Sequence, residues 1–445
     1  MSGTGTDRAT LIRVWHLAWP VILSNVTTPL LGLVDTAVVG RLPGPEYIGA
    51  VAIGAAAFTG IFWMFGFLRM GTTGFVAQAM GAGDFTEVRA ILGRAILIAV
   101  LFGALLVVLQ QPLWSGAIHL LDPSTTVRGL AEQYFSIRVW TGPAALVNYA
   151  LLGFFIGMQR PRLALAIQIW LNGVNIALDL LFVVGLDMGV PGVAWATLIG
   201  EYSAAILGVV VALRVLRPHG GRFNWPAILD PVQGRRLLSA NFDIFVRTAC
   251  LIIAFSWATR VGARLGDLAL AANAILMQMV HLLAYGLDGF AFAAEALVGG
   301  ALGARSLGAL REAVVASTIW ALIVAVGVAI VYLVAGPLLI AVMTDQPDVQ
   351  ATAESYLFWI VLYPLLAIWC YQLDGIFIGA TQTAEMRNAM ILSLGVFVVA
   401  ILTLPDMFGN HGLWASLSIF NVARTVTLGA YYRRIEVRAV KSQPA

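Results

Sequence analysis

The stretch Gly153-Phe-Phe-Ile-Gly157 returns late in the chain as Gly375-Ile-Phe-Ile-Gly379, 222 residues further on. The same offset aligns identical residues in other regions: Gly40, Gly44, Ala50, Ile53, Gly81, Ala82, Arg89 and Tyr134 fall on Gly262, Gly266, Ala272, Ile275, Gly303, Ala304, Arg311 and Tyr356. Single matches are common in a sequence rich in Ala, Gly and Leu, but one constant offset indicates an internal repeat. Because twice 222 nearly equals the 445 residues of the chain, we expect two halves of one architecture.

The composition identifies the solvent that this chain requires. Hydrophobic residues make up 60% of it, charged residues only 11%, and the mean hydropathy is +0.89. An ordinary soluble domain carries about 25% charged residues, so this chain could not cover a water-exposed surface and is predicted to lie in a bilayer. The net charge of +3 comes almost entirely from arginines between apolar runs, which does not indicate nucleic-acid binding.

Several classes of active site are excluded by residue type and spacing. The single lysine, Lys441, lies in the C-terminal tail, so the chain has no P-loop. Cys250 and Cys370 lack CxxC partners, and the five histidines have no metal-ligand spacing. Neither an HExxH zinc motif nor a GxSxG elbow occurs. We therefore expect no metal, no cofactor and no enzymatic activity.

Twelve apolar segments are each long enough to cross the roughly 30 Å of hydrocarbon as a helix. They run over 14–39, 48–76, 91–114, 130–157, 162–186, 190–214, 236–261, 268–299, 312–343, 350–379, 386–404 and 411–432. Eighteen of the 26 basic residues then fall on the side of the termini, and four fall on the opposite side. The positive-inside rule predicts a multi-pass protein of the cell inner (plasma) membrane with both termini in the cytoplasm.

The repeat and the spans together predict the domain organisation. Each half holds six spans, an even number, so the two lobes have the same orientation in the membrane. We expect an N-terminal lobe over 1–213, a cytoplasmic linker over 214–236, a C-terminal lobe over 237–434 and a cytoplasmic tail over 435–445. Two pseudo-symmetric lobes favour a transporter over a channel, for which no filter repeat is present.

Carboxylates inside the first six spans are the leading functional candidates. A charge in hydrocarbon costs at least about 2.5–3.5 kcal/mol, so such a group faces a cavity, has a partner or is protonated. Asp35, followed by Thr36, lies in the outer third of the first span and is predicted to accept the coupling proton; a structural Asp paired with Arg41 is the alternative. Pro20 kinks the helix that leads to it.

The fifth span carries a second polar group of residues. Asn172, Asn175 and Asp179 stand at positions i, i+3 and i+7, which lie on one face of a helix. This stripe predicts a cavity lining, with hydrogen bonding between helices as the alternative. Asp179 lies at the depth of Asp35, and two carboxyls facing each other there would form one proton site.

The second half has charged residues of a different arrangement. Asp243 and Arg247 are four residues apart on one span and are expected to form an intrahelical ion pair. Asp288, Glu295 and Asp374 lie toward the predicted cytoplasmic ends of their spans. They are candidates for holding arginines there or for closing an inner gate.

Longer motifs resemble the MATE (multidrug and toxic compound extrusion) family. They are Pro20-Val-Ile-Leu-Ser-Asn-Val-Thr-Thr-Pro-Leu-Leu-Gly-Leu-Val-Asp35-Thr-Ala-Val-Val-Gly40, Gln78-Ala-Met-Gly-Ala-Gly-Asp84 and Gly192-Val-Ala-Trp-Ala-Thr-Leu-Ile-Gly-Glu-Tyr202. Leu373-Asp-Gly-Ile-Phe-Ile-Gly-Ala-Thr-Gln-Thr-Ala-Glu-Met-Arg-Asn388 and Asn241-Phe-Asp-Ile-Phe-Val-Arg247 resemble its DinF branch. The resemblance covers essentially the whole chain.

The resemblance implies a fold and an activity. It implies twelve helices in two lobes and the efflux of cationic or amphipathic organic compounds, driven by H⁺ or Na⁺. It also implies that Asp35 is the proton-site carboxylate, with Asn175 and Asp179 as partners and Pro20 as the kink proline. The NorM-like branch has acidic cation ligands in its second lobe that this chain lacks near Arg247 and Pro364. This difference favours H⁺ over Na⁺.

The predicted function is thus a proton-coupled antiporter that acts by alternating access on small organic substrates, as a monomer and without a nucleic-acid partner. The alternative is a flippase for lipid-linked precursors from the same superfamily. Such flippases have an arginine-lined cavity for pyrophosphate, whereas only four arginines lie inside the spans here. The arginine count therefore favours the antiporter.

Overall fold

The structure, a computed structural model, describes residues 7–121 and 124–441, and its regular elements there are helices. The first half holds α1 (Arg8–Val39), α2 (Pro45–Met64), α3 (Phe67–Gly81), α4 (Phe85–Val108), α5 (Gln110–Leu121), α6 (Thr125–Arg138), η1 (Val139–Thr141), α7 (Gly142–Gly157), α8 (Pro161–Asp179), η2 (Leu180–Gly185) and α9 (Gly189–Leu216). The second half holds α10 (Trp225–Ile228), α11 (Pro231–Arg264), α12 (Asp267–Gly303), α13 (Leu307–Met343), α14 (Pro347–Ser355), α15 (Leu357–Gly379), α16 (Thr383–Phe408), α17 (Asn410–Gly429) and α18 (Tyr432–Lys441).

Ten helical segments of the described residues are long and apolar enough to cross a membrane. In several of them two elements run together, as α2 with α3 and α6 with α7 do. The helices α1, of 32 residues, and α17, of 20, occupy the two remaining places of the repeat. The prediction of an all-α membrane fold is confirmed, and ten of the twelve predicted spans overlap with these segments.

The turns between helices repeat with the offset of 222 seen in the sequence. Backbone φ is positive at Gly83 and Arg305, at Gln159 and Thr381, and at Asp187 and Gly409. The helices that follow the first of these turns also start alike, because Asp84 caps α4 and Ser306 caps α13. The repeat is therefore carried by the same backbone geometry in both halves.

The quoted glycine stretches explain how α7 and α15 pack. A Cβ on Gly153 would lie 2.4 Å from the carbonyl oxygen of Arg69 in α3, and a Cβ on Gly375 would lie 2.4 Å from that of Ala291 in α12. These four residues are again related by 222. Only glycine permits such an approach of two helix backbones.

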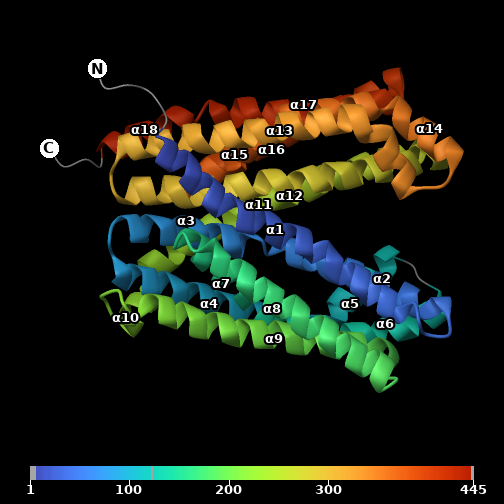
Figure 1. The fold of residues 1–445 in the computed structure, drawn as a ribbon, viewed down its shortest axis with the longest axis horizontal. Helices are drawn as coiled ribbons and strands as arrows, with labels where there is room; N and C mark the ends of the chain where they lie inside the picture. The colour runs from blue at the N-terminus through green and yellow to red at the C-terminus, as the bar shows by residue number, and fades with distance from the viewer. Residues whose placement is uncertain (1–6, 122–123, 442–445) are drawn as a thin grey trace. The chain divides into compact units, whose positions relative to one another are not determined.

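The contacts divide the chain into two compact units. Unit 1 comprises Met1–Ile22 and Ser239–Ala445, and unit 2 comprises Leu23–Leu238. In each unit the long helices run side by side (Figure 1). The start of α1 belongs to unit 1, where Trp320 donates a hydrogen bond to the carbonyl of Leu11 at 3.0 Å and its ring lies tilted against that of Trp15, 5.0 Å between centroids.

The predicted linker, 214–236, is bound to unit 2 along much of its length. Arg89 of α4 donates to the carbonyls of Leu216 and His219 at 2.7 and 2.9 Å. Arg94 donates to the carbonyl of Ile228 in α10 at 3.2 Å. Two arginines that indicated topology in the sequence therefore also hold the linker. The end of the predicted tail, 442–445, lies outside the described residues, and the lobe boundaries stay a prediction.

Candidate functional site

The polar stripe of the fifth predicted span lies on α8, and a change of helix type follows it. Asn175 and Asp179 are fully buried, and Asn172 is 9% exposed. Directly after Asp179 the chain continues as the π-helix η2. π-Helical turns concentrate at functional sites because they redirect side chains within a helix. The sequence showed the stripe, but it carried no signal for this turn.

The two carboxyls predicted as the proton site face each other in unit 2. Asp35 on α1 is 8% exposed, and its side chain is in hydrogen-bonding contact with that of Asp179 on α8. One further oxygen on each carboxyl, Oδ1, is buried without a hydrogen-bond partner. A hydrogen bond between two carboxyls requires a proton on one of them. The pair is thus arranged to hold a shared proton.

Asn175 lies between this pair and α9. With its amide nitrogen toward Asp179, 2.9 Å from Oδ2, its oxygen lies 3.1 Å from the hydroxyl of Thr197. The Thr197 side chain is 2% exposed. Asn175 therefore links α8, and through it the carboxyl pair, to α9.

A cation, Arg138, and a third carboxylate, Glu201, complete this polar cluster, and neither was predicted to be a site residue. The guanidinium of Arg138 on α6 acts electrostatically on Asp35 and on Asp179, and it donates a hydrogen bond to the hydroxyl of Tyr134. It also interacts with Glu201 of α9. The signal available in the sequence was an arginine inside a predicted span.

The remaining predicted residues of unit 2 lie nearby or face away. Asn172 donates a long hydrogen bond, 3.4 Å, to the carbonyl of Thr27 on α1. Thr36 is exposed, and its hydroxyl donates to the carbonyl of Gly32 in its own helix. The structure therefore does not bring Thr36 to the carboxyl pair. Pro20 is buried within α1, two residues before the chain passes from unit 1 to unit 2 at Ile22.

In unit 1 the predicted ion pair between Asp243 and Arg247 is wrong. Asp243 instead accepts from Arg387 at 2.6 Å and from Thr383 at 2.9 Å, both on α16. Arg247 pairs with Asp374 of α15. Each of these two side chains pairs with a residue on a neighbouring packed helix, and not with the residue four positions away on its own helix.

The other acidic candidates of unit 1, Asp374, Asp288 and Glu295, contact different residues and do not form one site. Asp374 also pairs with Arg424 of α17, at 2.7 Å, so it holds two arginines as one of the predictions proposed. Asp288 interacts electrostatically with Tyr285 and Tyr371. Glu295 is 1% exposed, and its backbone carbonyl lies against Gly379. None of these acids joins a group of three or more His, Cys, Asp or Glu side chains within 7–121 and 124–441 that could hold a metal.

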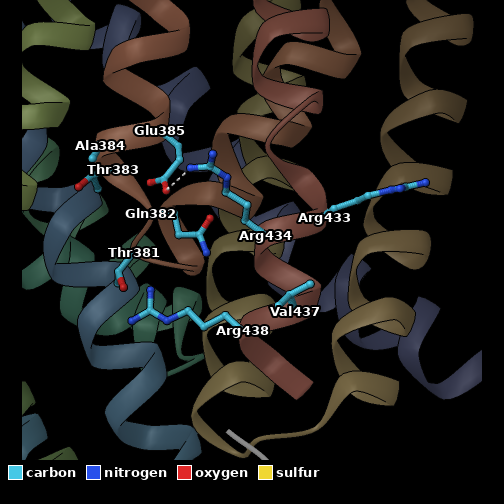
Figure 2. A pocket seen from close by; sticks show the side chains of 9 residues that line it. All are labelled: Thr381, Gln382, Thr383, Ala384, Glu385, Arg433, Arg434, Val437 and Arg438. Atoms are coloured by element: carbon cyan, nitrogen blue, oxygen red, sulfur yellow. Dashed lines mark ion pairs between the residues drawn. The ribbon is translucent and has the colours of Figure 1, made fainter. Parts of the chain in front are cut away.

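A cavity of about 560 Å³ opens in unit 1, and none of the predicted site residues lines it, although its Thr383 donates to Asp243. Residues from the start of α16 and from α18 line it: Thr381, Gln382, Thr383, Ala384, Glu385, Arg433, Arg434, Val437 and Arg438. Figure 2 shows Arg434 turned toward Glu385, at 3.7 Å, and Arg433 turned away. Its charged side chains are mostly exposed, so this pocket does not have the burial that a coupling site requires.

Comparisons with known proteins agree with this architecture. A family model described as MatE matches residues 20–181 and 244–404. The DNA damage-inducible protein F of Escherichia coli (strain K12) is 42% identical over 97% of this chain and 93% of its own length. A probable multidrug resistance protein NorM of Acinetobacter baylyi is 22% identical over 96% of each chain.

Solved structures give the same result for the fold. An outward-facing multidrug resistance transporter of the MATE family matches with a TM-score of 0.86 and 20% identity over 98% of this chain and 99% of its own. A MOP superfamily transporter from Pyrococcus furiosus matches with a TM-score of 0.85 and 19% identity over 98% and 97%.

Proposed function

This chain belongs to the MATE family of multidrug efflux transporters, and on that premise we propose that it is a proton-coupled antiporter that exports small amphipathic or cationic organic compounds. Asp35 and Asp179 are the proposed coupling site, with H⁺ rather than Na⁺ as the driving ion. The observation that carries the proposal is the contact between these two carboxyls inside unit 2.

The chemistry of the pair supports a proton cycle. In hydrogen-bonding contact the two carboxyls hold at least one proton, and its loss would leave two negative charges side by side in a buried place. Arg138 and the Asn175 amide are positioned to stabilise the charge that then develops. Deprotonation thus weakens the contact between the two carboxyls and favours their contacts with Arg138 and Asn175.

Coupling follows if the substrate prefers one of these two states. A substrate that binds the deprotonated pair more tightly is released when a proton enters from outside, and the reverse exchange occurs on the inner side. Pro20, which lacks an amide hydrogen, gives α1 a place to bend during this exchange. Alternating access of this kind needs no ATP.

The proposed setting is the cell inner membrane, with both termini in the cytoplasm and the protein acting as a monomer. Eighteen basic residues on the side of the termini, against four on the other, support this orientation. The predicted direction of transport, outward for substrate and inward for protons, depends on it.

The test measures proton movement in proteoliposomes. Wild-type protein is reconstituted into acid-loaded vesicles without sodium, and proton efflux is recorded after ethidium is added outside. We expect dye-dependent efflux from wild type and its loss, by at least about tenfold, in Asp35→Asn and Asp179→Asn.

The matched control is Asp187→Asn, eight residues beyond Asp179 and exposed. It should retain wild-type rates, since its carboxyl lies outside the cluster. Full activity in Asp35→Asn would remove this residue from the coupling site. Activity that appears only when sodium is added would replace H⁺ by Na⁺, and no dye-dependent movement in either condition would favour the flippase.

A further inference from the structure

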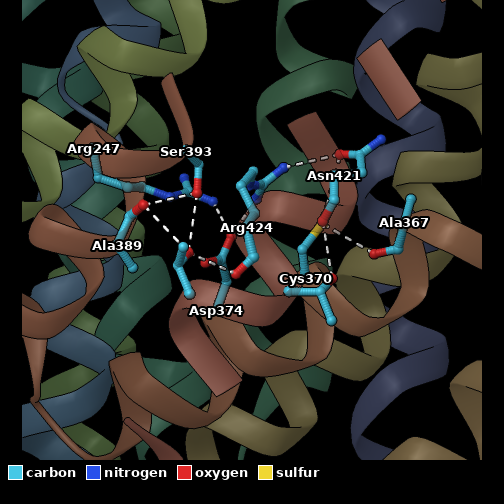
Figure 3. A network of polar contacts seen from close by, with 10 residues as sticks. Arg247, Ala367, Cys370, Asp374, Ala389, Ser393, Asn421 and Arg424 are labelled. Atoms are coloured by element: carbon cyan, nitrogen blue, oxygen red, sulfur yellow. Dashed lines mark hydrogen bonds and ion pairs between the residues drawn. The ribbon is translucent and has the colours of Figure 1, made fainter. Parts of the chain in front are cut away.

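Two buried arginines of unit 1 share one carboxylate. Arg247 of α11 and Arg424 of α17 approach Asp374 of α15 from different helices (Figure 3). Arg247, Arg424 and Asp374 are 8%, 7% and 8% exposed, respectively. Each arginine therefore has little water with which to interact.

The two ion pairs use a single oxygen. Arg247 and Arg424 both donate to Oδ2 of Asp374. One carboxylate thus pairs with two guanidinium groups, which leaves the cluster with an excess of one positive charge. A buried arginine without a full counter-charge is costly in a membrane interior, so the excess calls for an anion.

The unsatisfied atoms of the cluster are all hydrogen-bond donors. Nε of Arg247 and Nε of Arg424 are buried without a partner, and the side chain of Asn421, which is 2% exposed, is in contact with the hydroxyl of Tyr363. The Asn421 oxygen already accepts from Arg424 Nη1 at 3.4 Å and from Cys370 at 3.7 Å. What the cluster lacks is an acceptor.

The neighbouring acids are committed to other groups. Asp243, one turn from Arg247, accepts from Arg387 and Thr383. Asp288 interacts with Tyr371, which lies beside Arg424 in the electrostatic network. Asp243 and Arg387 form a separate, balanced ion pair, so they do not offset the excess positive charge of Arg247, Asp374 and Arg424.

We propose that unit 1 binds a singly charged anionic group, a halide ion or an organic carboxylate, at Arg247, Arg424 and Asn421. One negative charge would neutralise the excess, whereas a doubly charged phosphate would reverse it. Guanidinium and amide N–H groups suit both ligands, and the positive charge repels a metal cation. A carboxylate ligand would extend the substrates of the proposed exporter to zwitterions, while a halide would be a resident ion.

The experiment measures chloride binding directly and needs no transport. Chloride exchanging with a protein site gives a broadened NMR line, so the excess linewidth is recorded for the full chain in detergent. Sulfate, whose double charge would reverse the excess instead of neutralising it, replaces chloride to keep the ionic strength constant. Acetate and benzoate are then added as competitors.

Variants with opposite expected signs separate binding from unfolding. Arg247→Gln and Arg424→Gln should each weaken chloride binding about tenfold or more, because each removes a charged donor. Asp374→Asn should strengthen it about tenfold, because it removes the competing negative charge. Arg311→Gln is the control, since Arg311 pairs with Glu436 of α18 away from the cluster.

Displacement of chloride by acetate or benzoate would assign the site to carboxylates as well, and resistance to them would assign it to halides. Either result supports an anion site. The proposal is overturned if wild type shows no excess linewidth, or if the linewidth stays at the wild-type value in both arginine variants. The chloride assay uses neither dye nor gradient, so a negative result would not bear on the Asp35–Asp179 proposal. A negative result in the proton-efflux assay would likewise not bear on the anion site.

Discussion

At the scale of single residues, Asn175 is expected to contribute to stability as well as to coupling. Replacing it with leucine removes both the amide that donates to Asp179 and the amide oxygen near Thr197. Leaving buried polar groups unpaired costs about 1–3 kcal/mol, so Asn175→Leu should lower the thermal midpoint of the purified protein. Fluorescence-detected melting in detergent measures the effect.

Asn172→Leu serves as the comparison, one turn earlier on α8. Its amide nitrogen makes a long contact of 3.4 Å to the Thr27 carbonyl, and its oxygen accepts from Gln168 at 3.0 Å. Gln168 is only half-buried and can turn to another partner, so the loss of Asn172 should cost less than half as much. An equal or larger destabilisation by Asn172→Leu would show that the Asn175 contacts contribute little. The pair of variants thus separates the network from the general cost of adding leucine to this face.

Residue types alone indicated the carboxyl pair, because an acid in an apolar run is conspicuous and the two lie at equal depth. Partners of arginines were harder to predict. A guanidinium on a long side chain reaches any adjacent helix, so the partners of Arg138 and Arg424 could not be assigned from residue types and spacing. The wrong Asp243–Arg247 pair has the same cause, since the actual partner, Arg387, is 144 residues from Asp243.

At the scale of elements, the close contact of α12 with α15 predicts a sharp sensitivity at Gly375. Its added Cβ would meet backbone, the Ala291 carbonyl at 2.4 Å, which cannot move aside as a side chain can. Gly375→Ala should therefore destabilise unit 1 by about 1–3 kcal/mol. The thermal midpoint reports this loss.

The matched control is Gly395→Ala on α16, where an added Cβ meets nothing within 4 Å. Alanine favours a helix over glycine by up to about 1 kcal/mol, so this variant should be neutral or more stable. A similar loss of stability in both variants would contradict the packing argument. The sequence supplied the repeated glycines, but their partners on α3 and α12 required the packed helices.

At the scale of the whole molecule, the constant offset was the most informative part of the sequence. It predicted two equivalent halves, and the positive-φ turns repeat with the same spacing. The grouping of the start of α1 with Ser239–Ala445 could not be predicted, because the first span, 14–39, is one continuous apolar run in the sequence. Its two ends differ in what they pack against, and that depends on tertiary contacts such as Trp320 with Leu11.

Orientation in the membrane can be tested at the two ends of α13, which spans 37 residues or roughly 55 Å. Gly308 and Asp345 are both exposed, one near each end. In a background with Cys250→Ala and Cys370→Ala, a membrane-impermeant maleimide should label Asp345→Cys in intact cells and leave Gly308→Cys unlabelled. After permeabilisation both should react equally, which controls for local reactivity. Eighteen of the basic residues lie on the predicted Gly308 side, which is why this side is expected in the cytoplasm. The reverse labelling pattern would mean that the arginine distribution does not orient this chain. The proposed direction of export would then be reversed as well.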